Sequence, residues 1–510
     1  MGLIQLFLEQ PENKQKILRL KAQGMPDKRI AAEVGLSENA VGQYFSTVCA
    51  DLGLKIKKDY SVLQKLIAQV DEHLGLKNKV ALSVSTVTPE PNPMSYSQYV
   101  EQSINKSNEY RKTHWDDLNK IRSSGLVTQF LQQYYKDLPN LLIVKRNSAQ
   151  PFIYPCVFLV NPDTNCALDG VQSNMVMDLT GKSQKTQLDF EYRFFRVAKQ
   201  PDLLEFNKVT FALRLAEVSN GELKIDIYPS DYLSGLDTSE SLSWELMKAI
   251  YEFQNANPSA SKTEVIANVE NQLPLRKRIE DLTKKDFFNG IGRAATFGVA
   301  MLFIYRGSDG NYWFTANVRS GEVAVQANSV HTLPAGMFQT EFPLAGLNLE
   351  AQAEEWGIEK RIICEWLEEV YGHKEYRDKA TRKPYAEIQQ DEATVMPVLV
   401  ELLKQKKAEL LCSGIAIDLI NLRPEICTVL IVHEYNEQIV SRMRASKESE
   451  GKKIEYFLLE DIEKQKPNVM QYLAPENMVA SGAAAIWQGL KIALPKLYPI
   501  KVNASLKNLP

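Results

Sequence analysis

A stretch rich in serine, threonine and proline, residues 83–96, divides the sequence into two unequal parts. Pro89, Pro91 and Pro93 lie close together in it, which favours an extended backbone that packs poorly against a core. Because 510 residues are also too many for one ordinary hydrophobic core, we expect a multidomain α+β protein with a domain boundary in this stretch.

The overall composition limits the classes of protein to which the chain can belong. Hydrophobic residues make up 44% of the sequence and charged residues 24%, which are values of globular proteins. The net charge of −3 gives no basic field over the whole molecule, so any contact with nucleic acid has to be confined to one region. The six cysteines include no Cys-x-x-Cys pair, which argues against a zinc framework or a secreted disulfide scaffold and favours a cytoplasmic protein.

We expect neither an export signal nor a membrane span. Residues 2–8 are mostly apolar, but the apolar run is short, no basic residue accompanies it and Glu9 follows. Residues 479–497 are the most apolar late stretch, and Gln488, Lys491 and Lys496 interrupt it. This stretch therefore predicts a core helix, and we expect no membrane partner.

Residues 14–53 carry apolar side chains at helical spacing in three short groups that glycines separate. The first group ends at Gly24 and the second at Gly35. Leu36 can then fill the turn, and Ser37 can cap a third helix. Three short helices joined in this way are typical of a helix-turn-helix domain, whose second helix enters the major groove of DNA.

Residues 17–41 resemble the LuxR/GerE type of bacterial DNA-binding module, because they follow its pattern of I-L-x-L-x-A-x-G-M and then I-A-x-x-x-G-L-S-E-N-x-V. The resemblance implies a helix-turn-helix domain over residues 1–58 and a role in transcription regulation. It also implies groove-facing side chains on the third helix and basic side chains near phosphate. The candidates are Ser37, Asn39, Gln43, Tyr44 and Thr47 for the groove, and Lys28 and Arg29 for phosphate.

The predicted recognition helix has no lysine or arginine between Ser37 and Leu52, so we expect a single copy to bind DNA weakly. Residues 59–96, a helix and a proline-rich linker, carry a stripe that can pair two copies into a homodimer. Packing of this helix on its own domain explains the stripe equally well. A three-helix module used for protein contact is the alternative to DNA binding. The stripe consists of Leu63, Ile67, Val70 and Leu74.

Residues 97–280 are predicted to form a middle α+β domain without a cluster of catalytic side chains. Residues 97–150 look helical, and β-branched and aromatic runs follow them. Asn220 and Gly221 indicate a hairpin turn between two of these runs. The predicted strands are residues 152–160, 186–198, 208–218 and 222–229, and the predicted helices at the end are residues 239–251 and 262–273.

Residues 281–510 are predicted to form a C-terminal domain with a regular succession of elements. Two strands precede a Leu-Pro-Ala-Gly segment, an acidic helix follows, and two more strands lead to a terminal helix rich in small residues. The predicted bounds are residues 297–305 and 312–318 for the first strands, 356–371 for the acidic helix, 410–422 and 426–432 for the later strands, and 477–494 for the terminal helix.

This succession resembles a Nudix hydrolase domain, in which a Leu-Pro-Gly-Gly loop precedes an R-E-x-x-E-E helix. The matching residues are Leu333-Pro334-Ala335-Gly336 and Cys364-Glu365-Trp366-Leu367-Glu368-Glu369. The resemblance implies a Nudix-like α/β/α sandwich over residues 281–510. Because Cys364 stands where the family has arginine, whether the domain hydrolyses a nucleoside diphosphate is left open.

Glu365, Glu368 and Glu369 are spaced so that their carboxylates share one face of a helix. Like charges crowded in this way repel, and Mg²⁺ would relieve the repulsion while binding phosphate oxygens. The resemblance therefore implies Mg²⁺ at these glutamates and a nucleotide-like small molecule, with Arg306 and Arg319 as candidate phosphate ligands. A solvent-exposed acidic helix face is the alternative.

Together these features favour a DNA-binding transcriptional regulator whose Nudix-like domain senses a nucleotide metabolite. One alternative is a Mg²⁺-dependent pyrophosphohydrolase that the helix-turn-helix docks to DNA or to a partner. A third hypothesis is an interaction protein in a multi-component system. Function here depends on the sites and does not follow from the fold class.

Overall fold

The structure, a computed structural model, describes residues 14–51 and 105–175 with short gaps, and residues 209–318, 329–338, 356–373, 385–443 and 453–498. These residues form a mixed α+β protein. The chain falls into two compact units, which we take in turn. The N-terminal unit comprises Met1–Ser95 with Ala345–Leu347, and the α/β unit comprises Tyr96–Leu344 with Asn348–Pro510.

The N-terminal unit contains α3 (Asp27–Val34) and α4 (Glu38–Asp51), after helical residues between positions 14 and 21. The hydroxyl of Ser37 accepts the N–H of Ala40 at 3.2 Å and so caps α4, as predicted. Leu36 packs on the small core, also as predicted. That core consists of Ile17, Ile30, Ala31 and Val41, with Val34, Leu36 and Phe45 packed against it. The predicted stripe and linker of residues 59–96 lie outside the described residues.

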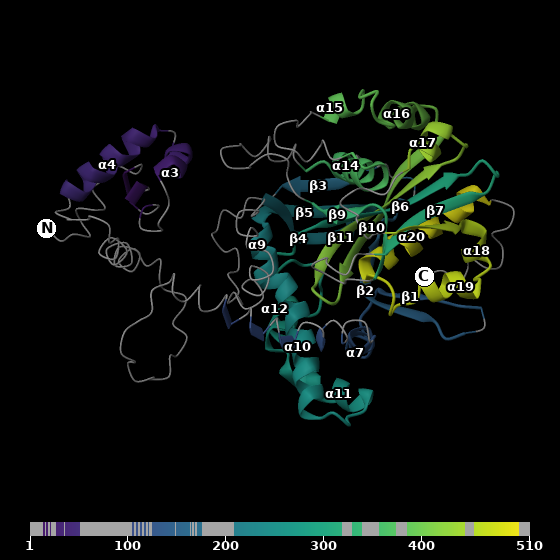
Figure 1. Cartoon of the computed structure of the whole chain (residues 1–510), viewed down its shortest axis with the longest axis horizontal. Coiled ribbons are helices and arrows are strands. Elements are labelled where there is room, and N and C mark those ends of the chain that lie inside the picture. Colours follow the sequence, from purple (N-terminus) through teal and green to yellow (C-terminus); the bar gives the residue numbers. More distant parts are fainter. Residues whose placement is uncertain are drawn as a thin grey trace. The chain divides into compact units, whose positions relative to one another are not determined.

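The α/β unit is built on a curled sheet with the strand order β1-β2-β10-β11-β6-β7-β12 (Figure 1). Short strands β8 and β9 pair with β7 and β6. Among the described strands of this sheet, β11 and β6 pair in parallel and the others are antiparallel. The strands are β1 (Leu141–Val144), β2 (Phe152–Val160), β6 (Gly298–Arg306), β7 (Tyr312–Val318), β8 (Val330–Thr332), β9 (Ala335–Met337), β10 (Ala408–Asp418), β11 (Arg423–Val432) and β12 (Lys453–Leu458).

Helices cover both faces of this sheet, because alternate side chains of its central strands point to opposite sides. Leu302 of β6 belongs to the core that α20 (Ala480–Leu497) closes. Its neighbour Phe303 meets Trp366 of α14 (Ile358–Tyr371) edge to face, with ring centroids 5.4 Å apart. The remaining helices of these layers are α7 (Leu126–Tyr134), α15 (Tyr385–Ile388), α16 (Met396–Lys404), α17 (Glu437–Ser441), α18 (Leu459–Glu463) and α19 (Pro467–Tyr472).

A second sheet with the order β3-β5-β4 precedes a chain of helices. Asn220 and Gly221 form the predicted hairpin turn between β4 and β5, with φ values of 58° and 79°. The π-helical turn η3 then joins two α-helices and buries Glu240. The elements are β3 (Gln172–Met175), β4 (Val209–Ser219), β5 (Glu222–Asp231), α9 (Tyr232–Gly235), η3 (Leu236–Glu240), α10 (Ser241–Ala256), α11 (Lys262–Val269), η4 (Glu270–Gln272) and α12 (Pro274–Thr283).

Residues 97–280 and residues 281–510 contribute to one compact unit, although the sequence predicts a boundary at residue 280. Strand β2 from the first range pairs with β10 from the second, with Leu159 opposite Ile415. The second sheet also hydrogen-bonds to the segment before β6, where the N–H of Leu213 donates to the carbonyl of Ala295 at 2.9 Å. Both ranges therefore belong to one unit, because strands distant in sequence pair in a single sheet.

Two buried arginines hold the turn between β10 and β11. The guanidinium of Arg276, on α12, donates to the carbonyls of Leu419 at 2.7 Å and Ile420 at 2.6 Å. Arg293 donates to the carbonyl of Leu422 at 2.9 Å. Buried backbone carbonyls need hydrogen-bond donors, so these contacts allow the turn to lie inside the protein. We call these two arginines and the turn the arginine clamp.

The charge of Arg276 is compensated within the core. Its Nη1 donates to the hydroxyl of Tyr135 at 3.0 Å, and that hydroxyl donates to Glu280 at 2.6 Å. Burial acts to lower the pKa of Arg276, but Tyr135, Glu245 and Glu280 outweigh it and raise the pKa. Burial lowers the pKa of Arg293 to about 10, so both guanidinium groups are charged at neutral pH.

In the part of the chain that the structure describes, none of the helices is long and apolar enough to span a bilayer. The apolar stretch predicted as a core helix forms α20, whose Ile486, Leu490 and Leu494 are buried.

Replacing Arg276 with methionine is expected to lower the free energy of unfolding by about 3–5 kcal/mol, because Glu280 and the turn carbonyls lose a buried charged partner. Arg278→Met is the matched control, since Arg278 is exposed on the same helix and its loss should change stability by less than about 0.5 kcal/mol. Thermal and urea unfolding of the full chain measures both. Equal losses for the two variants would contradict a clamping role.

Candidate functional site

The outer face of α4 presents polar side chains to solvent, as the predicted recognition helix requires. Val41 is fully buried and Phe45 packs on the core, which turns the intervening positions outward. Tyr44 is 41% exposed, so Phe45, and not Tyr44, supplies the inward aromatic side chain. The exposed predicted positions are Ser37, Gln43, Tyr44 and Thr47 on or before α4, and Lys28 on α3.

Two other predicted DNA contacts fall on residues whose side chains are not described. Arg29 lies in α3 and Asn39 in the first turn of α4. Helix α4 carries no lysine or arginine, and the described basic side chains near it include the exposed Lys28 and the buried Lys21, whose ammonium lies 5.0 Å from the centre of the Phe45 ring. The surface can therefore offer hydrogen bonds to base edges and little neutralisation of phosphate.

The acidic helix α14 faces the Leu-Pro-Ala-Gly segment, as the sequence resemblance implies. Glu369 accepts the N–H of Ala335 at 2.9 Å. A Cβ atom at Gly336 would overlap the carboxyl group of Glu365, so only glycine fits there without a shift. Glu365 and Glu368 are 1% and 4% exposed, which shows that the alternative of a solvent-exposed acidic face is wrong for these two residues.

The contacts of these carboxylates are made by protein groups. Arg361, one turn earlier on α14, forms an ion pair with Glu365. The backbone N–H of Ala335 donates a hydrogen bond to the carboxylate of Glu369. Among the described residues, no three His, Cys, Asp or Glu side chains are placed to hold a metal ion. The arrangement does not fit Mg²⁺ as it stands. Mg²⁺ and hydrolysis stay predictions from the sequence, and no step proposed below uses them.

The structure does not bring Arg306, one of the two predicted phosphate ligands, to the acidic helix. Arg306 ends β6, whereas β9 and the Gly336 loop pair with its beginning at Gly298, roughly 26 Å away along an extended strand. The guanidinium of Arg306 instead donates to the carbonyl of Gly310 in the following hairpin. Arg319 lies outside the described residues.

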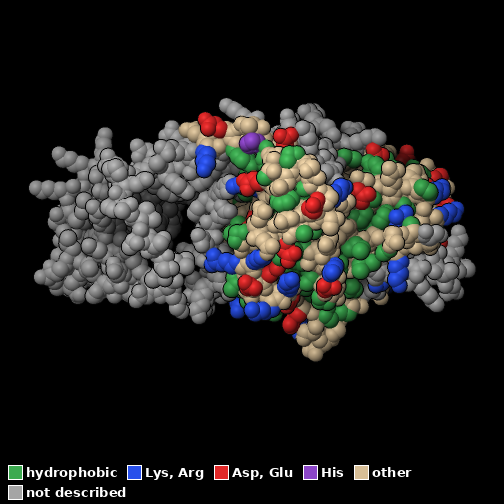
Figure 2. Space-filling model, turned by 90° about the horizontal axis from the view of Figure 1, so that it is seen from below, with side chains coloured by type: hydrophobic (Ala, Val, Ile, Leu, Met, Phe, Trp, Pro, Cys, Tyr) green, Lys and Arg blue, Asp and Glu red, His purple; other side chains and the backbone are tan. Residues whose placement is uncertain are grey.

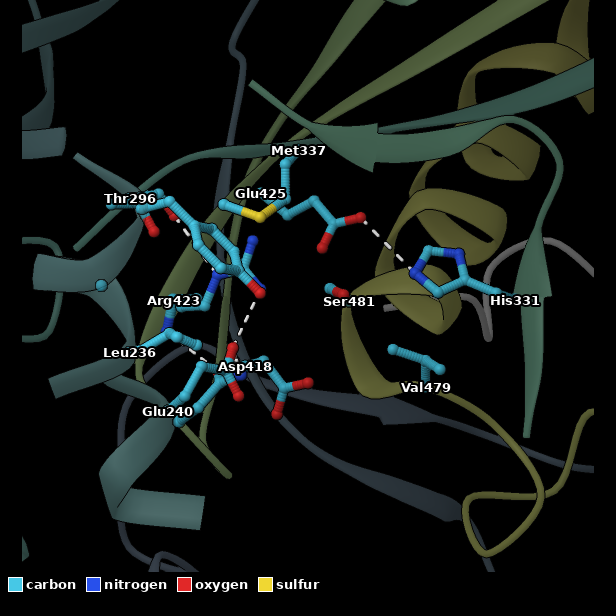
Figure 3. A pocket seen from close by; sticks show the side chains of 13 residues that line it. Leu236, Glu240, Thr296, His331, Met337, Asp418, Arg423, Glu425, Val479 and Ser481 are labelled. Carbon is cyan, nitrogen blue, oxygen red and sulfur yellow. Dashed lines mark hydrogen bonds and ion pairs between the residues drawn. The ribbon is translucent and has the colours of Figure 1, made fainter. Parts of the chain in front are cut away.

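A polar cavity of about 160 Å³ lies at the first turn of α20, and we call it the α20 pocket (Figure 3). Helix α9, η3, the residues before β6, strands β8 and β9, the β10–β11 turn and α20 all contribute walls. Figure 3 shows Ser481 and Val479 near His331, with Arg423, Asp418 and Glu240 across the cavity. The lining residues with polar chemistry include Glu240, Thr296, His331, Asp418, Arg423, Glu425 and Ser481.

Ion pairs organise the charged side chains of the α20 pocket. Arg423 Nη1 donates to Glu240 Oε1 at 2.9 Å, and Asn421 Nδ2 donates to the same oxygen at 3.0 Å. On the other side, His331 Nε2 lies 3.5 Å from Glu425 Oε1. Burial acts to lower the pKa of Arg423, but Glu240 outweighs it and raises the pKa. The guanidinium of Arg423 is therefore charged at neutral pH.

Two glycines let the ionisable side chains approach the backbone of neighbouring elements. A Cβ atom at Gly482 of α20 would lie 3.0 Å from Nδ1 of His331, and one at Gly298 of β6 would lie 3.3 Å from the carboxyl carbon of Glu425. A larger residue at Gly482 would crowd His331, and a larger residue at Gly298 would crowd Glu425. The pocket is thus built from close contacts between α20, β8, β6 and β11.

Sequence reasoning missed the α20 pocket, because its residues come from elements that are far apart in the chain. One signal was present, since Asp418, Arg423 and Glu425 are charged residues at the facing ends of two mostly apolar strands. Charged residues are almost never fully buried unless they are paired, so such a pattern marks a site that needs explanation.

No known protein-family model matches this sequence, and no curated protein matches it either.

Gly336→Ala is expected to destabilise the α/β unit by about 1–3 kcal/mol, because the added methyl group overlaps Glu365. In a Glu365→Ala background the same change should be less damaging, since the overlapping carboxyl group is gone. Unfolding of the two single variants and the double variant gives the coupling free energy. Additive losses would show that the acidic helix does not pack on this loop.

Proposed function

We propose that this protein is a DNA-binding transcriptional regulator that reads the major groove with α4 and is controlled by a small molecule bound in the α/β unit. The observation that supports the DNA-binding part is that α4 has one face packed on the core and one face exposed to solvent. Val41 and Phe45 face the core, while Gln43, Tyr44 and Thr47 are exposed on the same helix. Amide, hydroxyl and aromatic side chains of this kind recognise base edges.

Electrostatics favour a regulator that acts through more than one copy. Most of the affinity of proteins for DNA comes from phosphate neutralisation, and α4 supplies no cation for it. On the face of the α/β unit seen in Figure 2, basic and acidic side chains are interspersed, so this face offers no basic stripe for DNA. A dimer doubles the contacts made by Lys28 and its neighbours, which is why we retain the predicted homodimer as part of the proposal.

Control by a ligand requires that the ligand bind one DNA-binding arrangement better than the other. A preference of roughly 1–3 kcal/mol gives a useful response. The polar α20 pocket supports the presence of a small-molecule site in the α/β unit. The nucleotide metabolite expected from the Nudix resemblance stays a prediction.

Base contacts and phosphate contacts can be separated by two substitutions, tested on DNA selected by the protein from a random pool and on unrelated DNA. Gln43→Ala should reduce the preference for selected DNA by about 1–3 kcal/mol, because a base-edge contact is lost. Lys28→Ala should weaken binding to both DNAs and lower the salt slope by about one.

The matched control for Gln43→Ala is Gln272→Ala, because Gln272 is an exposed glutamine of the α/β unit in η4. This change should leave DNA binding unaltered. If the unmodified protein selects no sequence and shows no salt-dependent DNA binding, the module has another role and protein contact takes its place.

Small-molecule control is tested by measuring DNA affinity with ADP-ribose or NAD added. If the α/β unit senses such a nucleotide, the affinity should change by roughly 5–150-fold at saturation. An unchanged affinity with both would remove nucleotide sensing and leave the DNA-binding proposal intact.

A further inference from the structure

The exposed face of α4 carries a definite set of side chains. Gln43 and Thr47 are both exposed and lie four residues apart, so they share one face of the helix, and Ser46 is exposed beside them. Val41 and Phe45 have the same spacing and pack on the core. Because successive residues of a helix turn by about 100°, Gln43 and Thr47 point away from that core.

The chemistry of this face suits the edges of bases better than the core of a protein interface. Gln43, Ser46 and Thr47 offer an amide and two hydroxyls with little apolar surface, and Tyr44 on the flank adds a ring that ends in a hydroxyl. Interface cores between proteins are depleted in serine and in other small polar residues. Gly42 lies inside the same helix, where glycine weakens the helix but lets its backbone approach a ligand closely.

Gln43 has the side chain that recognises adenine in the major groove. The amide oxygen of a glutamine accepts the N6 amino group of adenine, and the amide nitrogen donates to N7 of the same base. Guanine is recognised most often by arginine or lysine, which donate to its O6 and N7. Helix α4 contains neither residue, so it lacks the side chains that most often bind guanine.

Thr47 lies one helical turn beyond Gln43 and is suited to thymine. Four residues of a helix rise about 6 Å, which is close to two steps of about 3.4 Å between base pairs. Thr47 can therefore reach a base pair one or two steps from the pair that Gln43 contacts. The methyl group of a threonine packs well on the methyl group of thymine, which cytosine lacks.

We infer that α4 recognises A·T base pairs. The amide of Gln43 hydrogen-bonds to the edge of an adenine, and the methyl group of Thr47 packs on a thymine one or two base pairs away. This inference rests on the proposed function, because it names the class of DNA site that the proposed regulator binds. It goes beyond DNA binding as such, since a helix in the same position can recognise G·C pairs through arginine.

The first test is the selection of binding sites by the full chain from a random pool of double-stranded DNA. The enriched positions should be A·T pairs. Gln43→Arg should change one enriched adenine to guanine, because arginine donates to both guanine acceptors. Gln272→Arg is the matched control, since it adds the same charge at an exposed glutamine of η4 and should leave the selected sequence unchanged.

Changes of single groups in the selected DNA then locate the adenine contact. Replacing the contacted adenine with 7-deazaadenine removes N7 and should weaken binding by the unmodified protein about tenfold. The same replacement should have little further effect on Gln43→Ala, because that variant has already lost the contact. Gln272→Ala should keep the full tenfold effect.

The thymine contact is tested in the same way. Replacing the contacted thymine with uracil removes its methyl group and should weaken binding about threefold. Thr47→Ser keeps the hydroxyl and loses the methyl group, so this variant should bind the two DNAs equally. Thr263→Ser is the matched control, since Thr263 is exposed on α11 and its replacement should preserve the threefold difference.

The inference is overturned if the enriched positions are G·C pairs, if Gln43→Arg selects the same bases as the unmodified protein, or if either variant keeps its full sensitivity to the modified base. In each of these outcomes the protein still binds specific DNA, so the proposed function stands. If the unmodified protein selects no sequence and shows no salt-dependent binding, the proposed function fails and the inference fails with it.

Discussion

The α/β unit depends on placing a backbone turn inside the protein, where its carbonyls would be unsatisfied without buried donors. Arg276 and Arg293 supply those donors, and Tyr135 and Glu280 compensate the charge of Arg276. Removing one partner from such a network is far more damaging than the net stabilisation of the pair suggests. Since the turn ends at Arg423, the clamp also sets the position of the guanidinium that neutralises Glu240 in the α20 pocket.

Local elements could be predicted well from the sequence, and long-range pairing could not. The strand predicted at residues 312–318 is β7, and the acidic helix predicted at residues 356–371 is α14. Both follow from patterns within one short segment. The three-residue strands β8 and β9 carry too little pattern to predict. The pairing of β2 with β10 joins residues about 250 positions apart, which no local pattern encodes, so one sheet was divided between two predicted domains.

For the candidate sites too, features set by local sequence could be predicted, and contacts between distant segments could not. The cap at Ser37 follows from a local sequence pattern, and the structure confirms it. The groove-facing positions of α4 came from the family resemblance; Gln43, Tyr44 and Thr47 are exposed, and their contacts with DNA stay a prediction. The shared face of Glu365 and Glu369 was also predictable, but their contacts with Arg361 and Ala335 were not, because these depend on the loop that packs there. Arg306 was placed wrongly near the acidic helix, since position at a strand end does not reveal which end of the sheet it occupies.

The parallel pairing of β6 with β11 has a consequence for how the molecule is made. Gly298 lies opposite Glu425, and the segment between them has to be synthesised before the two strands can meet. Ser481 is added later still, so a ribosome-bound chain that stops before this residue lacks a wall of the α20 pocket. The α20 pocket can therefore form only after β6, β11 and α20 have all been synthesised and have come together.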